Sequence, residues 1–260
     1  MADEKAKRKA KSKTKRGRTL ADKPFAGGKE KALSGKHSGP GLRVHGVRGR
    51  AGKPQDAERV SEDAGEYSST TRFIESALGI KSYAELAPFL AKGVERVMAL
   101  LLDRAPAELR VTPEFIRDLH KRAFEELFPA WAGHYRDRNV TVGKHKPPAY
   151  YEVPTLMRQY CDDAEQRLSS VGLKPPITDV LLEALAFTEG RFLTIHPFAD
   201  FNGRVARMLL FGLSYRLDLP PVELVPDEKS KTEYLSALSA ADKHNWLPLI
   251  EIWRQRLGVK

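Results

Sequence analysis

The residues best suited to chemistry lie in one run, HPFADFNGRVAR, from His196 to Arg207. Histidine titrates near neutral pH, so His196 can take a proton from an attacking hydroxyl group. Asp200 offers a carboxylate of the kind that holds Mg²⁺ when phosphate oxygens supply further ligands. Arg204 and Arg207 are three residues apart and share one helix face, and the arginine fork matches phosphate oxygens. The run therefore predicts a phosphate-transfer site.

The elements around this run follow from its neighbours. An apolar helix over residues 178–195 is expected to end before Pro197, because proline disfavours helical geometry at the preceding residue. The next helix is expected to begin with Asn202 as its N-cap and Gly203 beside it. The N–H groups at such a helix start bind anions, most often phosphate. Each of these residues alone has a common structural explanation, but their joint occurrence favours a phosphate site.

The remaining pattern predicts an all-α bundle interrupted by one β-hairpin. Ser82 and Thr112 are good N-caps, and Pro113 suits a first helical position. Residues 139–143, NVTVG, alternate polar and apolar side chains, which is typical of a short strand or hairpin. Helical periodicity indicates helices within residues 66–80 and over residues 82–101, 112–124, 153–168, 205–213, 234–241 and 247–257.

Charge divides the chain near residue 53. The 260 residues carry a net charge of +10, and residues 1–53 hold 17 Lys or Arg against 4 Asp or Glu. This basic stretch has too few large apolar side chains to fold. Residues 5–18 either contact nucleic acid or an anionic surface by charge alone, or form a solvated arm. We expect a disordered basic tail over residues 1–55, N-terminal helices over 56–110 and the domain with the run over 111–260.

Several protein classes are disfavoured. The sequence lacks the sustained apolar stretch that a signal peptide or a transmembrane segment needs. Cys161 is the only cysteine, which excludes an intramolecular disulfide, and no Cys/His cluster has zinc-ligand spacing. SGKHSG, from Ser34 to Gly39, lacks the upstream glycine and the Ser/Thr after lysine of a P-loop. These features predict a cytoplasmic protein.

The run from His196 to Arg207 resembles the signature of the Fic (fido) family, HxFx(D/E)GNGRxxR, at every functional position but one. AGHYRDRNVTVGKHKPPAYYEVPTLM and YLSALSAADKHNWLPLIEIW also resemble sequences of this family, so the likeness covers roughly Thr112 to Trp253. It implies a Fic-type helical bundle with a β-hairpin flap over residues 111–260. It also implies a protein adenylyltransferase that transfers AMP from ATP, with Mg²⁺, to a Tyr, Thr or Ser hydroxyl of a target protein.

The same resemblance assigns roles to individual residues. His196 would be the general base, Phe198 a packing residue that holds the loop, and Asp200 the Mg²⁺ ligand. Phosphate would be bound by Phe201, Asn202, Gly203, Arg204 and Arg207, the last of these on the distal phosphate. The flap would pair with the main chain of an extended target segment; its residues are Asn139, Val140, Thr141, Val142 and Gly143.

Phe201 is the one departure from the signature, because the family usually has glycine there. Glycine allows positive φ and lets phosphate approach the main chain closely. Either the loop keeps its shape with the Phe201 ring turned inward as core, or an altered cradle changes the transferred group. The first outcome is favoured because Asn202, Gly203 and both arginines remain.

Thr71-Arg-Phe-Ile-Glu75-Ser76 resembles the inhibitory helix of many Fic proteins, (S/T)xxxE(G/N), with Ser76 as the mismatch. Glu75 would then pair with Arg207 and remove the cation meant for the γ-phosphate. The alternative is an ordinary surface glutamate. Two other functions stay open: an enzyme of this fold that transfers another phosphate-containing group or removes AMP, and a non-catalytic adaptor that acts through the basic tail.

Overall fold

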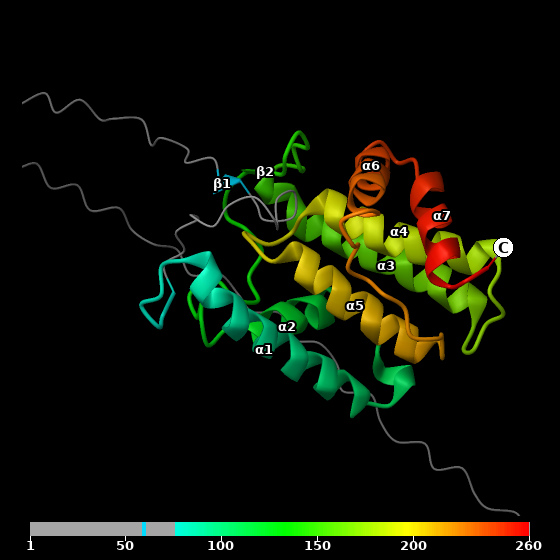
Figure 1. The fold of residues 1–260 in the computed structure, drawn as a ribbon, viewed down its shortest axis with the longest axis horizontal. Coiled ribbons are helices and arrows are strands. Elements are labelled where there is room, and N and C mark those ends of the chain that lie inside the picture. The colour runs from blue at the N-terminus through cyan, green and yellow to red at the C-terminus, as the bar shows by residue number, and fades with distance from the viewer. Residues whose placement is uncertain (1–58, 61–75, 260) are drawn as a thin grey trace, which may run out of the picture. The chain divides into compact units, whose positions relative to one another are not determined.

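The computed structural model describes residues 59–60, by main chain only, and residues 76–259. The described residues form seven α-helices, two 3-10 turns and two short strands, which confirms the predicted helical class (Figure 1). The predicted tail, Thr71 and Glu75 lie outside these residues. The elements in chain order are β1 Arg59–Val60, α1 Tyr83–Leu102, η2 Pro106–Glu108, α2 Pro113–Phe124, β2 Val140–Thr141, η3 Tyr150–Glu152, α3 Val153–Val171, α4 Asp179–Ile195, α5 Asn202–Arg216, α6 Lys231–Ala241 and α7 Leu247–Arg256.

Local capping explains where two of the helices begin. The Thr112 hydroxyl accepts from the N–H of Phe115 at 3.1 Å, with Pro113 at the first helical position. Thr178 caps α4 in the same way. Ser82 precedes α1 as predicted, but its side chain makes no capping hydrogen bond. These bonds satisfy N–H groups that the first turn of a helix leaves without partners.

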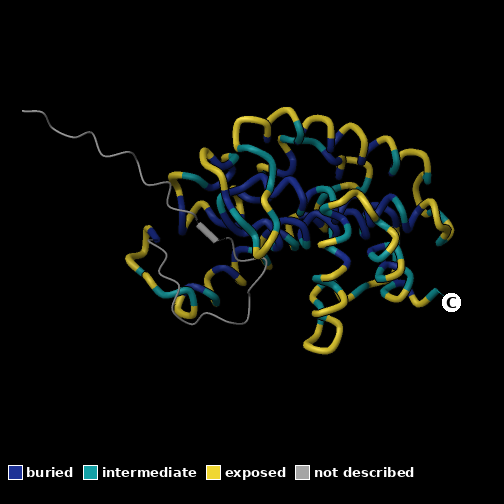
Figure 2. Tube along the Cα trace, turned by 90° about the horizontal axis from the view of Figure 1, so that it is seen from above, coloured by how far each residue is buried: buried dark blue, intermediate teal, exposed yellow. Residues whose placement is uncertain are grey.

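Helix α4 lies at the centre of the described fold. Twelve of its 17 residues are buried, as expected for a helix that is apolar on every side. It packs against α3, α5, α6 and α7. Figure 2 shows buried residues along the interior of the trace and exposed residues on its outer side. A Cβ at Gly190 would lie 2.8 Å from the Leu249 side chain and 2.9 Å from that of Trp246. This glycine therefore allows α6 and α7 to pack closely on α4.

Helix α1 packs against α2 and α5. Four leucine and valine side chains of this helix are buried: Leu86, Leu90, Val97 and Leu101. Phe89 on the same helix is 46% exposed. A Cβ at Gly93 would lie 2.1 Å from the carbonyl oxygen of Ala123. The two helices cross where α1 has no side chain to separate them.

The segment predicted as a short strand or hairpin, residues 139–143, contains the short strand β2. β2 pairs in parallel with β1, in the register Arg59 to Val140 and Val60 to Thr141. Beyond β2, Val142 and His145 exchange two main-chain hydrogen bonds of 3.0 and 2.9 Å around a turn in which Gly143 has φ +57°. The helix predicted within residues 66–80 does not extend over residues 76–79, which form a turn.

Candidate active site

The run from His196 to Arg207 forms a loop between α4 and α5, followed by the first turns of α5. His196 and Phe201 have φ values of +52° and +63°. Left-handed geometry at a residue with a Cβ costs roughly 1–2 kcal/mol, so the surrounding contacts must hold both residues in place. These two bends turn the chain sharply at the end of α4 and again at the start of α5.

Arg136, for which the sequence predicts no role, holds the first bend. Its side chain is buried, with Nε donating to the carbonyl oxygen of His196 at 2.9 Å and Nη2 to that of Ile195 at 3.4 Å. The same guanidinium donates to the carbonyl oxygens of Arg138 at 3.1 Å and Pro148 at 2.5 Å, on either side of the flap. Burial lowers the pKa of Arg136 to about 10, which leaves it charged at neutral pH.

His145, another residue given no role from sequence, meets the end of α4 from the flap. Its Nε2 lies 2.9 Å from the carbonyl oxygen of Thr194. A helix leaves its last carbonyl groups without partners, and a cation is favoured beside them. Arg136 and His145 thus attach the flap to the helix end that carries the candidate base.

His196 is 1% exposed, and burial lowers its pKa to about 3. Its Nδ1 lies 3.3 Å from the carbonyl oxygen of Leu193, which can only accept. Nδ1 therefore carries the hydrogen of the neutral ring, and the lone pair is on Nε2. A neutral imidazole with this tautomer is suited to accept a proton at Nε2.

Asp200 and Asn202 shape the loop between the bends. Asp200 Oδ1 accepts from the N–H of Phe201 at 2.8 Å, and His120 Nε2 lies 3.3 Å from the Asp200 carbonyl oxygen. Asn202 is the first residue of α5 and Phe201 occupies the N-cap position, so the predicted N-cap role of Asn202 is wrong. Its amide instead bonds both the N–H and the carbonyl of Phe198, at 2.9 and 3.1 Å. This pair of bonds closes the loop across four residues.

The Phe201 ring is turned inward, the first of the two outcomes considered from sequence. It is 1% exposed, with centroid distances of 4.5 Å to the ring of Phe124 and 5.4 Å to that of Phe128. Phe198 stacks on His120 at 4.0 Å beside it. A buried ring offers no group to a phosphate, so only the main chain of Phe201 could contribute to the predicted cradle.

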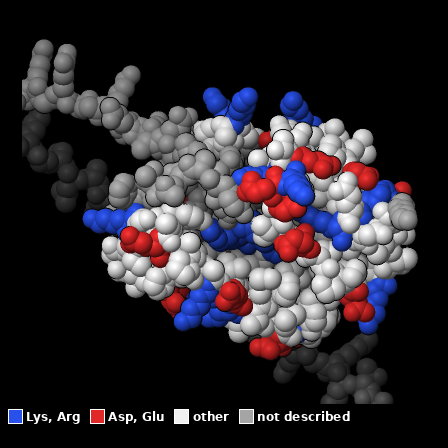
Figure 3. Space-filling view, viewed as in Figure 1, with Lys and Arg blue, Asp and Glu red and all other residues white. Residues whose placement is uncertain are grey.

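Arg204 and Arg207 are the only half-buried positions in the stretch from Phe201 to Leu210, where every other residue is buried. The Arg204 guanidinium lies over the Tyr83 ring at 5.5 Å and donates to the Tyr83 hydroxyl. Figure 3 shows Lys and Arg side chains gathered in a hollow over α5. Arg204 and Arg207 are therefore the positions of this stretch that reach the surface.

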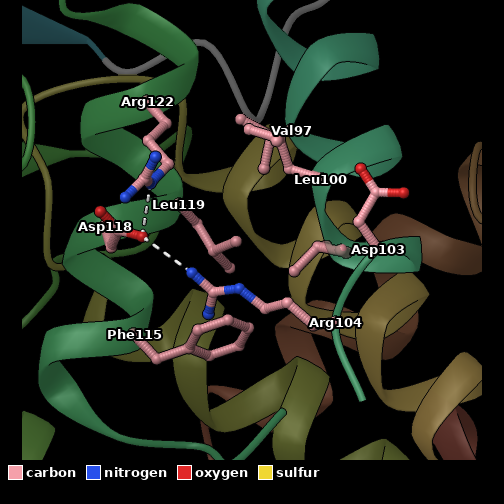
Figure 4. A pocket seen from close by; sticks show the side chains of 9 residues that line it. Val97, Leu100, Asp103, Arg104, Phe115, Asp118, Leu119 and Arg122 are labelled. Atoms are coloured by element: carbon pink, nitrogen blue, oxygen red, sulfur yellow. Dashed lines mark hydrogen bonds and ion pairs between the residues drawn. The ribbon is translucent and has the colours of Figure 1, made fainter. Parts of the chain in front are cut away.

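A pocket between α1 and α2 has no residue of the run in its lining (Figure 4). Its volume is about 220 Å³, and its wall includes Asp118, which lies 3.7 Å from Arg104 and 2.7 Å from Arg122. We do not assign this pocket to the chemistry of the run.

The residues around Asp200 bear on metal binding. Among residues 59–60 and 76–259 no group of three His, Cys, Asp or Glu side chains could hold a metal ion. A single carboxylate suits Mg²⁺ only where phosphate oxygens and water supply the other ligands. Asp200 at the start of α5 fits that requirement.

None of the helices within residues 76–259 has both the length and the apolar character that a membrane span needs.

The profile of the Fic/DOC family matches residues 110–213. A Drosophila willistoni protein named protein adenylyltransferase Fic is 29% identical over 158 residues, which are 61% of this chain and 30% of that protein. A protein of the same name from Nematostella vectensis is 31% identical over 133 residues, 51% of this chain and 30% of that protein. This chain thus spans less than a third of the curated relatives it matches.

Solved structures show the same fold at lower identity. The BepC protein of Bartonella tribocorum, a VirB-translocated effector solved with bound AMPPNP, superposes with a TM-score of 0.57 at 18% identity. The match covers 76% of this chain and 98% of that one. The arrangement of helices around the run is therefore shared well beyond the stretch that the family profile matches.

Proposed function

Because the chain belongs to the Fic/DOC family, we propose that it transfers AMP from ATP to a Tyr, Thr or Ser hydroxyl of a target protein. The observation that carries this proposal is the neutral, buried His196, held beside the acidic Asp200 and the start of α5. The half-buried arginines of α5, Arg204 and Arg207, follow Asp200 by four and seven residues. Together they supply a base, a metal ligand and phosphate-binding cations.

In this proposal His196 acts on the target hydroxyl. Its Nε2 takes the hydroxyl proton as the oxygen attacks the α-phosphorus of ATP. A new P–O bond forms to the target, the bond between the α-phosphorus and the bridging oxygen breaks, and pyrophosphate leaves. Proton transfer of this kind contributes roughly 10²–10⁴ in rate. The Leu193 carbonyl holds the ring in the tautomer whose lone pair is on Nε2.

The phosphates would lie over the start of α5. The main-chain N–H groups of the first turn and the positive end of the helix dipole favour an anion there. Arg204 and Arg207 would neutralise phosphate oxygens, with Arg207 on the distal phosphate. Asp200 would hold Mg²⁺, which neutralises the charge that builds up on the phosphates. An extended target segment would bind between β2 and this site and pair with the main chain of the flap.

The main-chain pairing of β2 with Arg59–Val60 supports the flap's proposed role. An extended segment of this chain already lies along the strand, so the flap has an edge suited to such pairing. Pairing of this kind selects extended segments through their main chain, not through their side chains. The target of the reaction is accordingly proposed as an extended, hydroxyl-bearing segment.

Incubation with ATP labelled at either the α- or the γ-phosphate tests the transferred group. AMP transfer leaves only the α-label on protein, and His196→Ala should abolish that label while the variant stays folded by circular dichroism. Label from the γ-position alone would replace this proposal with phosphate transfer. If deleting residues 1–53 removed a binding activity that His196→Ala left intact, the adaptor hypothesis would take its place.

A further inference from the structure

His145 makes contacts with two other elements from the flap turn. Its Nδ1 lies 3.2 Å from Oδ2 of Asp242, the residue after α6, and its Nε2 lies 2.9 Å from the Thr194 carbonyl oxygen in α4. The Thr194 hydroxyl donates to the other carboxylate oxygen of Asp242 at 3.1 Å. The His145 and Asp242 side chains are only 17% and 22% exposed. The flap turn is thus tied to α4 two residues before His196.

Both contacts of His145 can be made only with one added proton. The Thr194 carbonyl has no hydrogen to give, so Nε2–H must donate to it. An ionised Asp242 likewise has no hydrogen to donate. If His145 were neutral, with its hydrogen on Nε2, the lone pair of Nδ1 would face the lone pairs of the Asp242 carboxylate. The contact requires either His145 protonated on both nitrogens or Asp242 protonated on the carboxyl. In either case the two residues share one proton beyond that on Nε2.

We propose that His145 and Asp242 form a proton-dependent latch that holds the flap turn against the end of α4, which makes His145 a positioning residue. With the shared proton present, the flap is fixed beside the candidate base. When the proton leaves, either the ion pair with Asp242 or the hydrogen bond to Thr194 is lost, and the turn opens more often. Only the effect of the latch on turnover rests on the function proposed above, because the contacts themselves are made between residues of this chain.

The groups around the pair are consistent with a site that keeps this proton. Burial raises the pKa of Asp242, while the neighbouring His145 and the Thr194 hydroxyl oppose that shift. His145 also has a charge interaction with His196. Lys144 and Lys146 flank His145 on the flap and are exposed. A positive charge on His145 disfavours protonation of His196 and so helps to keep the base neutral.

Hydrogen exchange of the full chain tests the latch without any turnover. The probes are the amides of Val142 and His145, which bond each other across the flap turn. Their protection is measured from pH 6 to pH 9 relative to the intrinsic exchange rate at each pH. Loss of a charge-assisted hydrogen bond changes an opening equilibrium by about ten-fold or more. The wild-type protection factors should therefore fall about ten-fold as the pH rises.

Asp242→Asn distinguishes a latch from an ordinary contact. The asparagine amide can donate to the Nδ1 lone pair of a neutral His145, so this variant needs no shared proton and should keep its protection up to pH 9. His145→Ala should show low protection at every pH. His134→Ala, which removes an exposed histidine just before the flap, should keep the wild-type profile and serves as the matched control.

Two results would overturn the latch: wild-type protection that stays level from pH 6 to pH 9, or an Asp242→Asn variant that loses protection with the wild-type profile. Neither result depends on AMP transfer. If the chain shows these exchange profiles but has no transferase activity, only the proposed function is rejected. If the chain is active but its profiles are level, only the latch is rejected.

Discussion

The Nε atom of Arg136 donates to the main-chain oxygen of His196 across 2.9 Å. This bond joins the first residue of the run from His196 to Arg207 to a side chain that also binds both ends of the flap. The flap and the candidate base therefore share one anchor. A change in that anchor should disturb the relation between target and base.

Arg136→Lys should keep the charge but lose most of the carbonyl contacts, because an ammonium group cannot reproduce the planar fork. We expect the free energy of unfolding to fall by about 3 kcal/mol and kcat/KM for the target to fall at least about ten-fold. Urea unfolding and steady-state kinetics measure the two effects. Arg138→Lys is the control, because Arg138 is exposed and pairs only with the neighbouring Asp137 among described residues. Equal losses in both variants would contradict the anchoring role.

Glu75→Gly should raise automodification by ATP if Glu75 occupies Arg207 in the resting enzyme. Removing the carboxylate frees the cation for the distal phosphate and lowers the negative charge that ATP must approach. The measurement is α-labelled AMP on the chain itself, and Glu66→Gly serves as a nearby acidic control. Equal labelling of the wild type and the Glu75→Gly variant would remove this form of inhibition.

Two buried histidines should make the protein lose stability in acid. Burial lowers the pKa values of His120 and His196 from 6.5 to about 3, so below pH 6.5 the unfolded chain binds protons that the folded chain does not. Each histidine lowers the free energy of unfolding by about 1.4 kcal/mol per pH unit between about pH 6 and pH 3.5.

His120→Gln should remove about half of that slope, because glutamine can accept from Gly133 and donate to Asp200 without titrating. Urea unfolding from pH 7 to pH 4.5 measures the slope. His134→Gln, at an exposed position, should leave it as in the wild type. A full slope in His120→Gln would contradict burial of a neutral histidine.

Replacing Phe201 with glycine has two opposite effects on stability: it relieves the strain of the left-handed main chain and it removes a buried ring. Glycine relieves the left-handed geometry by roughly 1 kcal/mol, whereas loss of the buried ring costs about 3–5 kcal/mol. Phe201→Gly should therefore lower the free energy of unfolding by about 3 kcal/mol. Phe201→Ala leaves the same cavity and keeps the strain, so calorimetry should find it less stable than Phe201→Gly. The opposite order would contradict the strain at this position.

Glu189 binds the last two helices through its buried carboxylate. Its oxygens accept from Tyr234 at 2.7 Å and from Trp253 and Arg256 at 2.8 Å each. Glu189→Gln leaves Arg256 without its charged partner and places an amide N–H donor among the donors of Tyr234, Trp253 and Arg256. The free energy of unfolding should therefore fall by about 3 kcal/mol. Glu183→Gln on the same helix breaks a half-exposed pair with Arg167 and should cost below about 1 kcal/mol. Similar losses in both variants would contradict the buried network.

The predicted helices and the phosphate-site run depended on short-range signals. Thr112 and Thr178 mark helix starts because a cap bonds an N–H group three residues away. His120 lies four residues after Ile116 on the buried face of α2, so the same periodicity contained a signal for its burial. Asn202 was predicted as the N-cap of α5 but is the first residue of that helix. Its amide bonds back to Phe198 and not forward along α5.

The helical class, most helix starts and the spacing of His196, Asp200 and the two arginines can be predicted from the sequence, since these depend on residues a few positions apart. The fold was needed to show that Arg136 is buried while Arg138 is exposed, that Phe201 faces the core, and that His145 meets Asp242. Each of these outcomes depends on packing between segments distant in the chain. The type of a residue and the local hydrophobic period contain no information about such packing.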